Sequence, residues 1–278
     1  MQISLLQCQS GADVQANLAF IEALLALLPR VDLEPQLVVL PEACLLFGGH
    51  ESKQKHIAKS AVESPLLGSL ANLAKQYQVY LIAGTIPILA HDGRAYSRSY
   101  LFDDDGEELG CYDKLHLFDV EVSDGTKTYR ESDTFYPGNK ISVVDTPFGK
   151  IGLAICYDLR FPELFRAMRL AGAELIALPS AFTKVTGEAH WQTLLQARAI
   201  ETQCFMLAAN QWGANDGGRE TWGQSMIVDP WGRILAQKKT GCGWVQAPLD
   251  KTKLNDIRQQ IPVAIHNRFA KPTLIEQS

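Results

Sequence analysis

The chain has 278 residues, of which 46% are hydrophobic and 21% are charged, and its formal net charge is −5. This composition excludes a disordered or fibrous chain, because it supplies enough apolar material for a packed core. The negative charge also argues against nucleic acid as a partner, since proteins that bind it normally present a basic face.

In the first half of the chain, short apolar runs alternate with amphipathic segments. The apolar runs predict strands: Gln2–Gln7, Gln36–Leu40 and Val79–Ala83. The amphipathic segments predict helices: one capped by Asp13 and ending near Leu28, and one over Pro65–Gln78. A hairpin follows around the turn at Asp104–Gly106, with strands at Tyr96–Phe102 and Glu107–Asp113.

The second half continues this alternation and adds two hairpins. The hairpins are predicted where two apolar runs flank a turn: Ile141–Val144 with Ile151–Ile155, and Ser225–Val228 with Ile234–Gln237. Two further apolar runs predict single strands: Leu175–Leu178 and Phe205–Ala209. Three helices are predicted: one ending at Met168–Gly172, one over His190–Cys204 and one over Lys251–Gln260.

Strands that alternate with helices but include antiparallel hairpins are typical of an α/β protein. They predict a mixed sheet covered by helices, with a second sheet packed behind it. We find no Pro/Gly-rich linker long enough to divide the chain. The prediction is therefore one domain over residues 1–278.

Cys156 lies where a buried strand meets the start of a helix, in the segment KIGLAICYDLRFPELFR. We expect Asp158 to cap this helix, Pro162 to lie in its first turn and Glu163 to face the positive end of its dipole. Such a position stabilises a thiolate and favours a nucleophile. The alternative is that Cys156 is only a small core residue, as most free cysteines are.

Three other polar residues stand near points where apolar strands stop: Glu42, Lys114 and Glu131. Active sites of open α/β sheets gather at strand ends. A buried carboxylate can accept the proton of a cysteine nucleophile, and a lysine can stabilise the oxyanion that forms at an attacked carbonyl. A second carboxylate can position the base, the lysine or a water. Taken singly, each of the three is explained more simply as a surface residue.

The six cysteines are scattered along the chain and include no CxxC pair. This pattern predicts free thiols in a reducing cytoplasm and argues against a disulfide framework or a zinc site. No apolar stretch reaches the roughly 18 residues that span a bilayer, and the first residues lack the basic flank and cleavage site of a secretory signal. We therefore expect a cytoplasmic protein without a membrane partner.

Seven segments together resemble the carbon–nitrogen hydrolase (nitrilase) superfamily, in the right order and over nearly the whole chain: VVLPEACLL, CYDKLHLFDVEV, RESDTFYPG, KIGLAICYDLRFPELFR, LPSAFTKVTGEAHW, LLQARAIETQCFMLAANQ and GQSMIVDPWGRIL. The resemblance implies a four-layer α-β-β-α sandwich, in which two mixed sheets pack face to face under helices. It implies a Glu–Lys–Cys triad at Glu42, Lys114 and Cys156, and an additional active-site glutamate at Glu131. It also implies a homodimer or a higher homo-oligomer.

Within the superfamily, the chain is most similar to amidases that act on deaminated glutathione. Amidases of α-ketoglutaramate (ω-amidases) are close relatives. The segment AFTKVTGEAHWQTLLQARAIETQC carries the similarity to the first group, whereas the final segment, FAKPTLIEQS, departs from the usual pattern. The implied reaction is hydrolysis of the terminal amide of a small, carboxylate-bearing substrate to an acid and ammonia.

In the mechanism that this resemblance implies, Glu42 accepts the thiol proton while the sulfur of Cys156 attacks the amide carbonyl. Lys114 and the backbone N–H of Tyr157 hold the oxyanion, and a thioester forms without any metal or organic cofactor. Two alternatives remain open at this stage. One is hydrolysis of an N-carbamoyl amine or a nitrile, and the other is a thiol sensor without enzymatic activity.

Five residues are predicted to contact the substrate, and Tyr157 is one of them. Arg160 is the predicted clamp for a substrate carboxylate, because arginine binds carboxylates through two hydrogen bonds. An ion pair between Arg160 and Glu163 is the alternative. Phe182, Thr183 and His190 are the other predicted pocket residues, although His190 can equally cap or pack at the start of its helix.

Overall fold

Two mixed sheets of six strands each form the centre of the computed structural model, which describes residues 1–30, 34–48, 52–123, 128–216 and 218–275. The first sheet contains, in spatial order, β16 (Gly243–Pro248), β1 (Gln2–Gln7), β2 (Gln36–Val39), β3 (Tyr80–Leu89), β4 (Ala95–Phe102) and β5 (Glu108–Asp113). The second contains β15 (Ile234–Lys238), β14 (Ser225–Val228), β11 (Phe205–Ala208), β10 (Leu175–Ala177), β9 (Gly149–Leu153) and β8 (Ser142–Thr146). Two separate ribbons complete the strands: β6 (Asp119–Glu121) with β7 (Thr128–Arg130), and β12 (Trp212–Ala214) with β13 (Glu220–Trp222).

Parallel pairs lie in the middle of both sheets, and antiparallel pairs lie at their edges. Strands β1, β2 and β3 run parallel in the first sheet, as β9, β10 and β11 do in the second. Strands β4, β5 and β16 extend the first sheet in antiparallel pairs. Strands β8, β14 and β15 do the same for the second sheet. The mixed character that the sequence predicted is confirmed.

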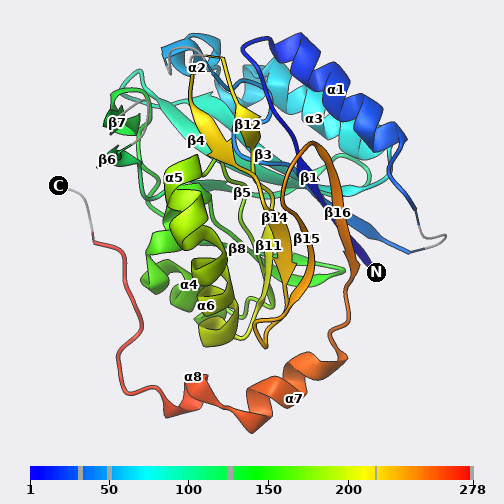
Figure 1. Ribbon diagram of the computed structural model, residues 1–278, viewed down its shortest axis with the longest axis vertical. Coiled ribbons are helices and arrows are strands. Elements are labelled where there is room, and N and C mark those ends of the chain that lie inside the picture. The colour runs from blue at the N-terminus through cyan, green and yellow to red at the C-terminus, as the bar shows by residue number, and fades with distance from the viewer. Residues whose placement is uncertain (31–33, 49–51, 124–127, 217, 276–278) are drawn as a thin grey trace.

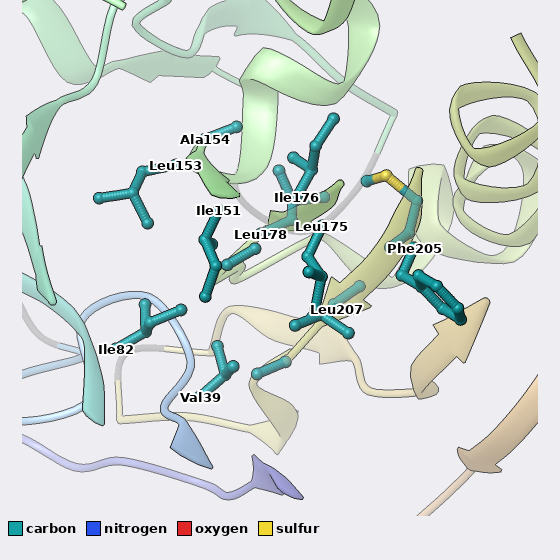
Figure 2. Close-up of a cluster of buried hydrophobic side chains, with 14 of the residues drawn as sticks. Val39, Ile82, Ile151, Leu153, Ala154, Leu175, Ile176, Leu178, Phe205 and Leu207 are labelled. Carbon is teal, nitrogen blue, oxygen red and sulfur yellow. The ribbon is translucent and has the colours of Figure 1, made fainter. Parts of the chain in front are cut away.

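The main core lies between the two sheets, because alternate side chains of each strand point into that space. Ile3 and Leu5, two residues apart on β1, both belong to this core. Figure 2 shows Val39 and Ile82 of the first sheet near Ile151 of the second. Burial of such side chains stabilises the fold by about 25 cal/mol per Å² of apolar surface.

Four helices cover the outer faces of the sheets (Figure 1): α1 (Val14–Ala26), α3 (Pro65–Gln76), α4 (Pro162–Leu170) and α6 (Gln192–Thr202). Leu25 of α1 and Leu70 of α3 pack in one cluster with Val38 of β2. On the other side, Met168 of α4 and Leu195 of α6 are fully buried against the second sheet. This order of helix, sheet, sheet and helix confirms the predicted α/β sandwich.

The remaining elements are short or lie near the C-terminus: α2 (Ser52–Ile57), α5 (Lys184–Thr186), α7 (Thr252–Gln260), α8 (Val263–His266), the 3₁₀ turns η1 (Ala61–Glu63), η2 (Glu131–Asp133) and η3 (Cys156–Arg160), and the π turn η4 (Gly187–Trp191). As predicted, Asp13 caps α1, because its carboxylate accepts hydrogen bonds from the first turn. None of the helices within the described residues has the length and apolar character to cross a membrane.

Several features differ from the sequence prediction, among them the four strands of the two ribbons, β6, β7, β12 and β13, which were not predicted. Strand β3 continues to Leu89 instead of ending at Ala83, because it pairs with β4 far along its length. The helix predicted over His190–Cys204 starts as the π turn η4, and α6 ends at Thr202 because Gln203 adopts a left-handed conformation with φ of 53°. Strand β16 was not predicted. Its partner β1 lies at the opposite end of the chain, so local sequence carries no sign of the pairing.

Candidate active site

Four chain segments that are distant in sequence converge on one cavity of about 470 Å³. Glu42 follows β2, Lys114 directly follows β5, Glu131 begins η2, and Cys156 begins η3 after β9. All four residues line the cavity, and their exposed fractions lie between 2% and 8%. The structure therefore brings together the four residues that the sequence singled out.

Lys114 lies between the carboxylates of Glu42 and Glu131. Its Nζ atom donates to Oε1 of Glu42 at 2.8 Å and to both carboxylate oxygens of Glu131 at 2.8 and 2.9 Å. Burial alone would lower the pKa of Lys114, but Glu131 and Glu42 outweigh it and raise that pKa well above its usual range. Burial raises the pKa of Glu131, against the opposing charge of Lys114. The ammonium therefore stays charged and offers all three of its protons to carboxylate oxygens.

The position of Glu42 depends on a close approach of two backbones. A Cβ atom on Gly84 of β3 would lie 2.0 Å from the carbonyl oxygen of Pro41, so only glycine fits there. Ala43 then takes a left-handed conformation with φ of 54°, and its N–H donates to Oγ1 of Thr85. The chain therefore turns sharply after β2 and directs Glu42 into the cavity.

Cys156 is also held in an uncommon backbone conformation. Its φ is 46°, and its N–H donates to the carbonyl of Pro179 at 2.9 Å. Two polar groups near the thiol act on its pKa in opposite directions: the Glu42 carboxylate raises it, and the backbone N–H of Ala181 lowers it. Burial and the negative charge of Glu42 raise the pKa of the thiol well above its usual range, and Lys114 only partly offsets this. The raised pKa favours the neutral thiol, contrary to the expectation of a stabilised thiolate.

Asp158 does not cap the helix that follows Cys156, so that prediction is also wrong. The 3₁₀ turn η3 separates the cysteine from α4, and α4 begins at Pro162. The fully buried carboxylate of Asp158 instead accepts hydrogen bonds from the N–H of Ile155 and the hydroxyl of Tyr112, both at 2.9 Å. It also binds the backbone N–H and Nδ1 of His116 at 3.2 and 2.7 Å. Asp158 therefore joins the segment that carries Lys114 to the segment that carries Cys156.

The residues predicted to contact substrate divide into two groups. Tyr157, Phe182 and Thr183 line the cavity, whereas Arg160 and His190 are not among its lining residues. Nη1 of Arg160 lies 3.3 Å from Nδ1 of His190, and its guanidinium lies over the Phe182 ring at 5.3 Å. Arg160 thus contacts Phe182, one of the residues that line the cavity.

Sequence reasoning did not find Arg219, a cation that lines the cavity from the loop before β13. Its segment, GGRETW, carries no motif or periodicity, and its place in the cavity follows only from the tertiary fold. Sequence reasoning also missed Phe47 and Tyr129, two aromatic residues of the same wall. Among the described residues, no group of three or more His, Cys, Asp or Glu side chains has the arrangement to hold a metal ion.

Comparisons with known proteins agree with this geometry. Residues 2–259 match the profile of the family described as carbon–nitrogen hydrolase. Over 269 residues the chain is 45% identical to the deaminated glutathione amidase of Yersinia enterocolitica, an alignment that covers 96% of this chain and 93% of that protein.

Two solved structures are similar to the whole sandwich. The C. elegans NitFhit protein superimposes with a TM-score of 0.87 and 36% identity over 96% of this chain; the chain spans 65% of that protein's length. A mutant of the amidase from Nesterenkonia sp. AN1 superimposes with a TM-score of 0.77 and 27% identity, over 95% of this chain and 99% of that one. In that mutant, acrylamide has added to the active-site cysteine.

Proposed function

This chain belongs to the carbon–nitrogen hydrolase family, and from that premise we propose that it is a thiol amidase that acts on a small, carboxylate-bearing amide. The observation that carries the proposal is the ammonium of Lys114, held between Glu42 and Glu131 at the wall of the cavity that Cys156 also lines. A nucleophile, a proton acceptor and a fixed positive charge are the groups that acyl transfer requires.

The first half of the reaction forms a thioester. Because the raised pKa favours the neutral thiol, Glu42 removes its proton as the sulfur of Cys156 bonds to the amide carbon. The oxyanion is held by the backbone N–H of Tyr157, in the first turn of η3, and by the charge of Lys114. Glu42 then gives the proton to the amide nitrogen, the C–N bond breaks, and ammonia or an amine leaves.

The second half of the reaction releases the acid. A water molecule attacks the thioester carbon and gives its proton to Glu42. The C–S bond then breaks, and Glu42 returns the proton to the sulfur of Cys156. Glu131 has no proton to transfer in this sequence; its role is to hold Lys114 through two hydrogen bonds, so that the positive charge stays beside the oxyanion.

The similarity to a deaminated glutathione amidase supports a γ-glutamyl-type amide as the substrate class. In glutathione the γ-carboxyl of glutamate is joined to an amine, so hydrolysis at that bond releases an amine. A primary amide such as α-ketoglutaramate releases ammonia instead. The cavity volume of about 470 Å³ lies within the range of small-molecule sites.

The direct test is amide hydrolysis by the wild type and by Cys156→Ala. We expect the variant to lose turnover and to keep the melting temperature of the wild type within a few degrees. The matched control is Cys242→Ser, because Cys242 is an exposed free thiol outside the cavity. Full activity in Cys156→Ala would contradict the assignment, and so would equal loss in both variants.

We also propose that the protein acts in the cytoplasm as a homodimer. All six cysteines are free thiols in the structure, as predicted, and this state suits a reducing compartment. The end of the chain exposes several large apolar side chains, a pattern typical of a surface that another chain covers: Ile265, Phe269 and Ile275. Light scattering at micromolar concentration tests the dimer, and a monomer mass would contradict it.

A further inference from the structure

We propose that Arg219 binds a carboxylate at the far end of the acyl chain and thereby selects amides of dicarboxylic acids. This inference rests on the proposed amidase function and names the residue that sets its substrate class. It differs from the sequence prediction, which gave the role of the clamp to Arg160.

The guanidinium of Arg219 is held by contacts on several sides. Its Cζ atom lies 5.0 Å from the ring centre of Phe47 and 4.9 Å from that of Tyr129. Its Nη2 atom donates to the carbonyl oxygen of Ala181 at 3.2 Å. Aromatic contacts of this kind stabilise a cation and restrict its rotamers, so less entropy is lost when an anion binds. A planar guanidinium held in place is suited to a carboxylate, which it can bind through two hydrogen bonds.

Ala181 links Arg219 to the nucleophile. Its backbone N–H lies near the Cys156 thiol, whose pKa it lowers, while its carbonyl accepts the hydrogen bond from Arg219. The attacking sulfur and the guanidinium therefore lie near opposite ends of one residue, and one residue spans about 3.5 Å of chain. A substrate only a few carbons long can place its amide carbonyl at Cys156 and its carboxylate at Arg219.

The other cations near the site fit this role less well. Lys114 donates its three protons to Glu42 and Glu131, so it has none left for a substrate carboxylate. Lys53 and Arg130 line the cavity, but both are exposed to solvent, where a charge pair gains little.

The cavity also has carboxylates of its own that would repel an anionic substrate. Asp133 and Asp216 line it together with Glu42 and Glu131. A carboxylate-bearing substrate therefore needs a fixed cation inside the cavity, and Arg219 is half-buried there.

The test compares glutaramate with glutaramide, which has nearly the same shape but no negative charge. Arg219→Met removes the charge and keeps an apolar side chain over Phe47 and Tyr129. We expect it to raise KM for glutaramate about 10- to 100-fold, as expected for a lost charge-assisted hydrogen bond. The kcat for glutaramate and the KM for glutaramide should change little, and Arg219→Lys should recover part of the loss. The matched control, Arg160→Met, should show no selective loss for the charged substrate.

Three results would overturn the proposal. Equal losses for both substrates in Arg219→Met would mean that the arginine has only a structural role. A selective loss in Arg160→Met would return the clamp to Arg160. If the wild type hydrolyses neither amide, the proposed function fails, and calorimetry with glutarate then tests Arg219 separately. In that measurement we expect glutarate to bind the wild type more tightly than Arg219→Met, and equal affinities would refute the role of Arg219.

Discussion

Replacing Glu42 with glutamine separates two effects that this carboxylate has on Cys156. Glu42 is the proposed proton acceptor, and its negative charge also raises the pKa of the Cys156 thiol. Glutamine keeps the shape of the side chain and one oxygen for Lys114, but it has neither the charge nor the basicity. We therefore expect Glu42→Gln to lower turnover and, at the same time, to lower the pKa of the thiol.

Both effects are large enough to measure. General acid–base catalysis contributes about 10²- to 10⁴-fold, so we expect kcat to fall by about that factor. This loss corresponds to about 3 to 5 kcal/mol of activation free energy. The negative charge of Glu42 is one of the causes that raise the thiol pKa of Cys156, so that pKa should fall when the charge is removed.

The assay pairs steady-state amide hydrolysis with a titration of the thiolate by its ultraviolet absorbance. The five other cysteines also absorb when they ionise, so each titration is repeated with Cys156→Ala added and the two curves are subtracted. The reasoning is refuted if Glu42→Gln turns over like the wild type. It is also refuted if the thiol pKa of Cys156 stays the same or rises.

Three further predictions concern the surroundings of the site. Asp158→Asn places an amide group against N–H and O–H donors in a fully buried site, so urea unfolding should show that the free energy of unfolding falls by about 3 kcal/mol. The same variant should lower kcat more than it changes KM. Gly84→Ala forces a Cβ atom to within 2.0 Å of a backbone oxygen, so it should cost about 1 to 3 kcal/mol of stability and reduce kcat. The control Gly68→Ala has open space around it on α3 and should be neutral or stabilising. Similar stabilities for the two variants would contradict this account. In native protein at mild alkaline pH, a disulfide reagent should react first with the exposed Cys242, and Cys242→Ser should remove this fast phase. A buried thiol should react more slowly, because burial raises its pKa, in the case of Cys8 to about 12. A fast phase that persists in Cys242→Ser would contradict this.

Much of the fold could be predicted because its signals are local. Apolar runs such as Gln36–Leu40 and Leu175–Leu178 mark buried strands, and the structure has a strand at each. The pairing of β16 with β1 could not be predicted, because it joins the two ends of the chain. The extent of the domain over residues 1–278 stays a prediction, since the family match ends at residue 259.

The site was predictable only in part. Glu42, Lys114 and Cys156 each follow an apolar strand, and this position along the chain is enough to mark them as candidates. The pKa of Cys156 could not be foreseen, because it depends on burial and on a carboxylate that is 114 residues away in sequence. Arg219 had no sequence signal at all, since its neighbours Phe47 and Tyr129 come from two distant segments. The roles of Arg160 and His190 stay predictions.

Mass spectrometry of the acid-quenched enzyme tests the central claim most directly. The wild type is mixed briefly with glutaramate, stopped, and digested under conditions that preserve thioesters. The account predicts that the peptide with Cys156 gains the mass of a glutaryl group, that Cys156→Ala gains none, and that the adduct is lost with time as free glutarate appears. Hydrolysis without any acyl adduct on that peptide, or an adduct on another cysteine, would contradict the account.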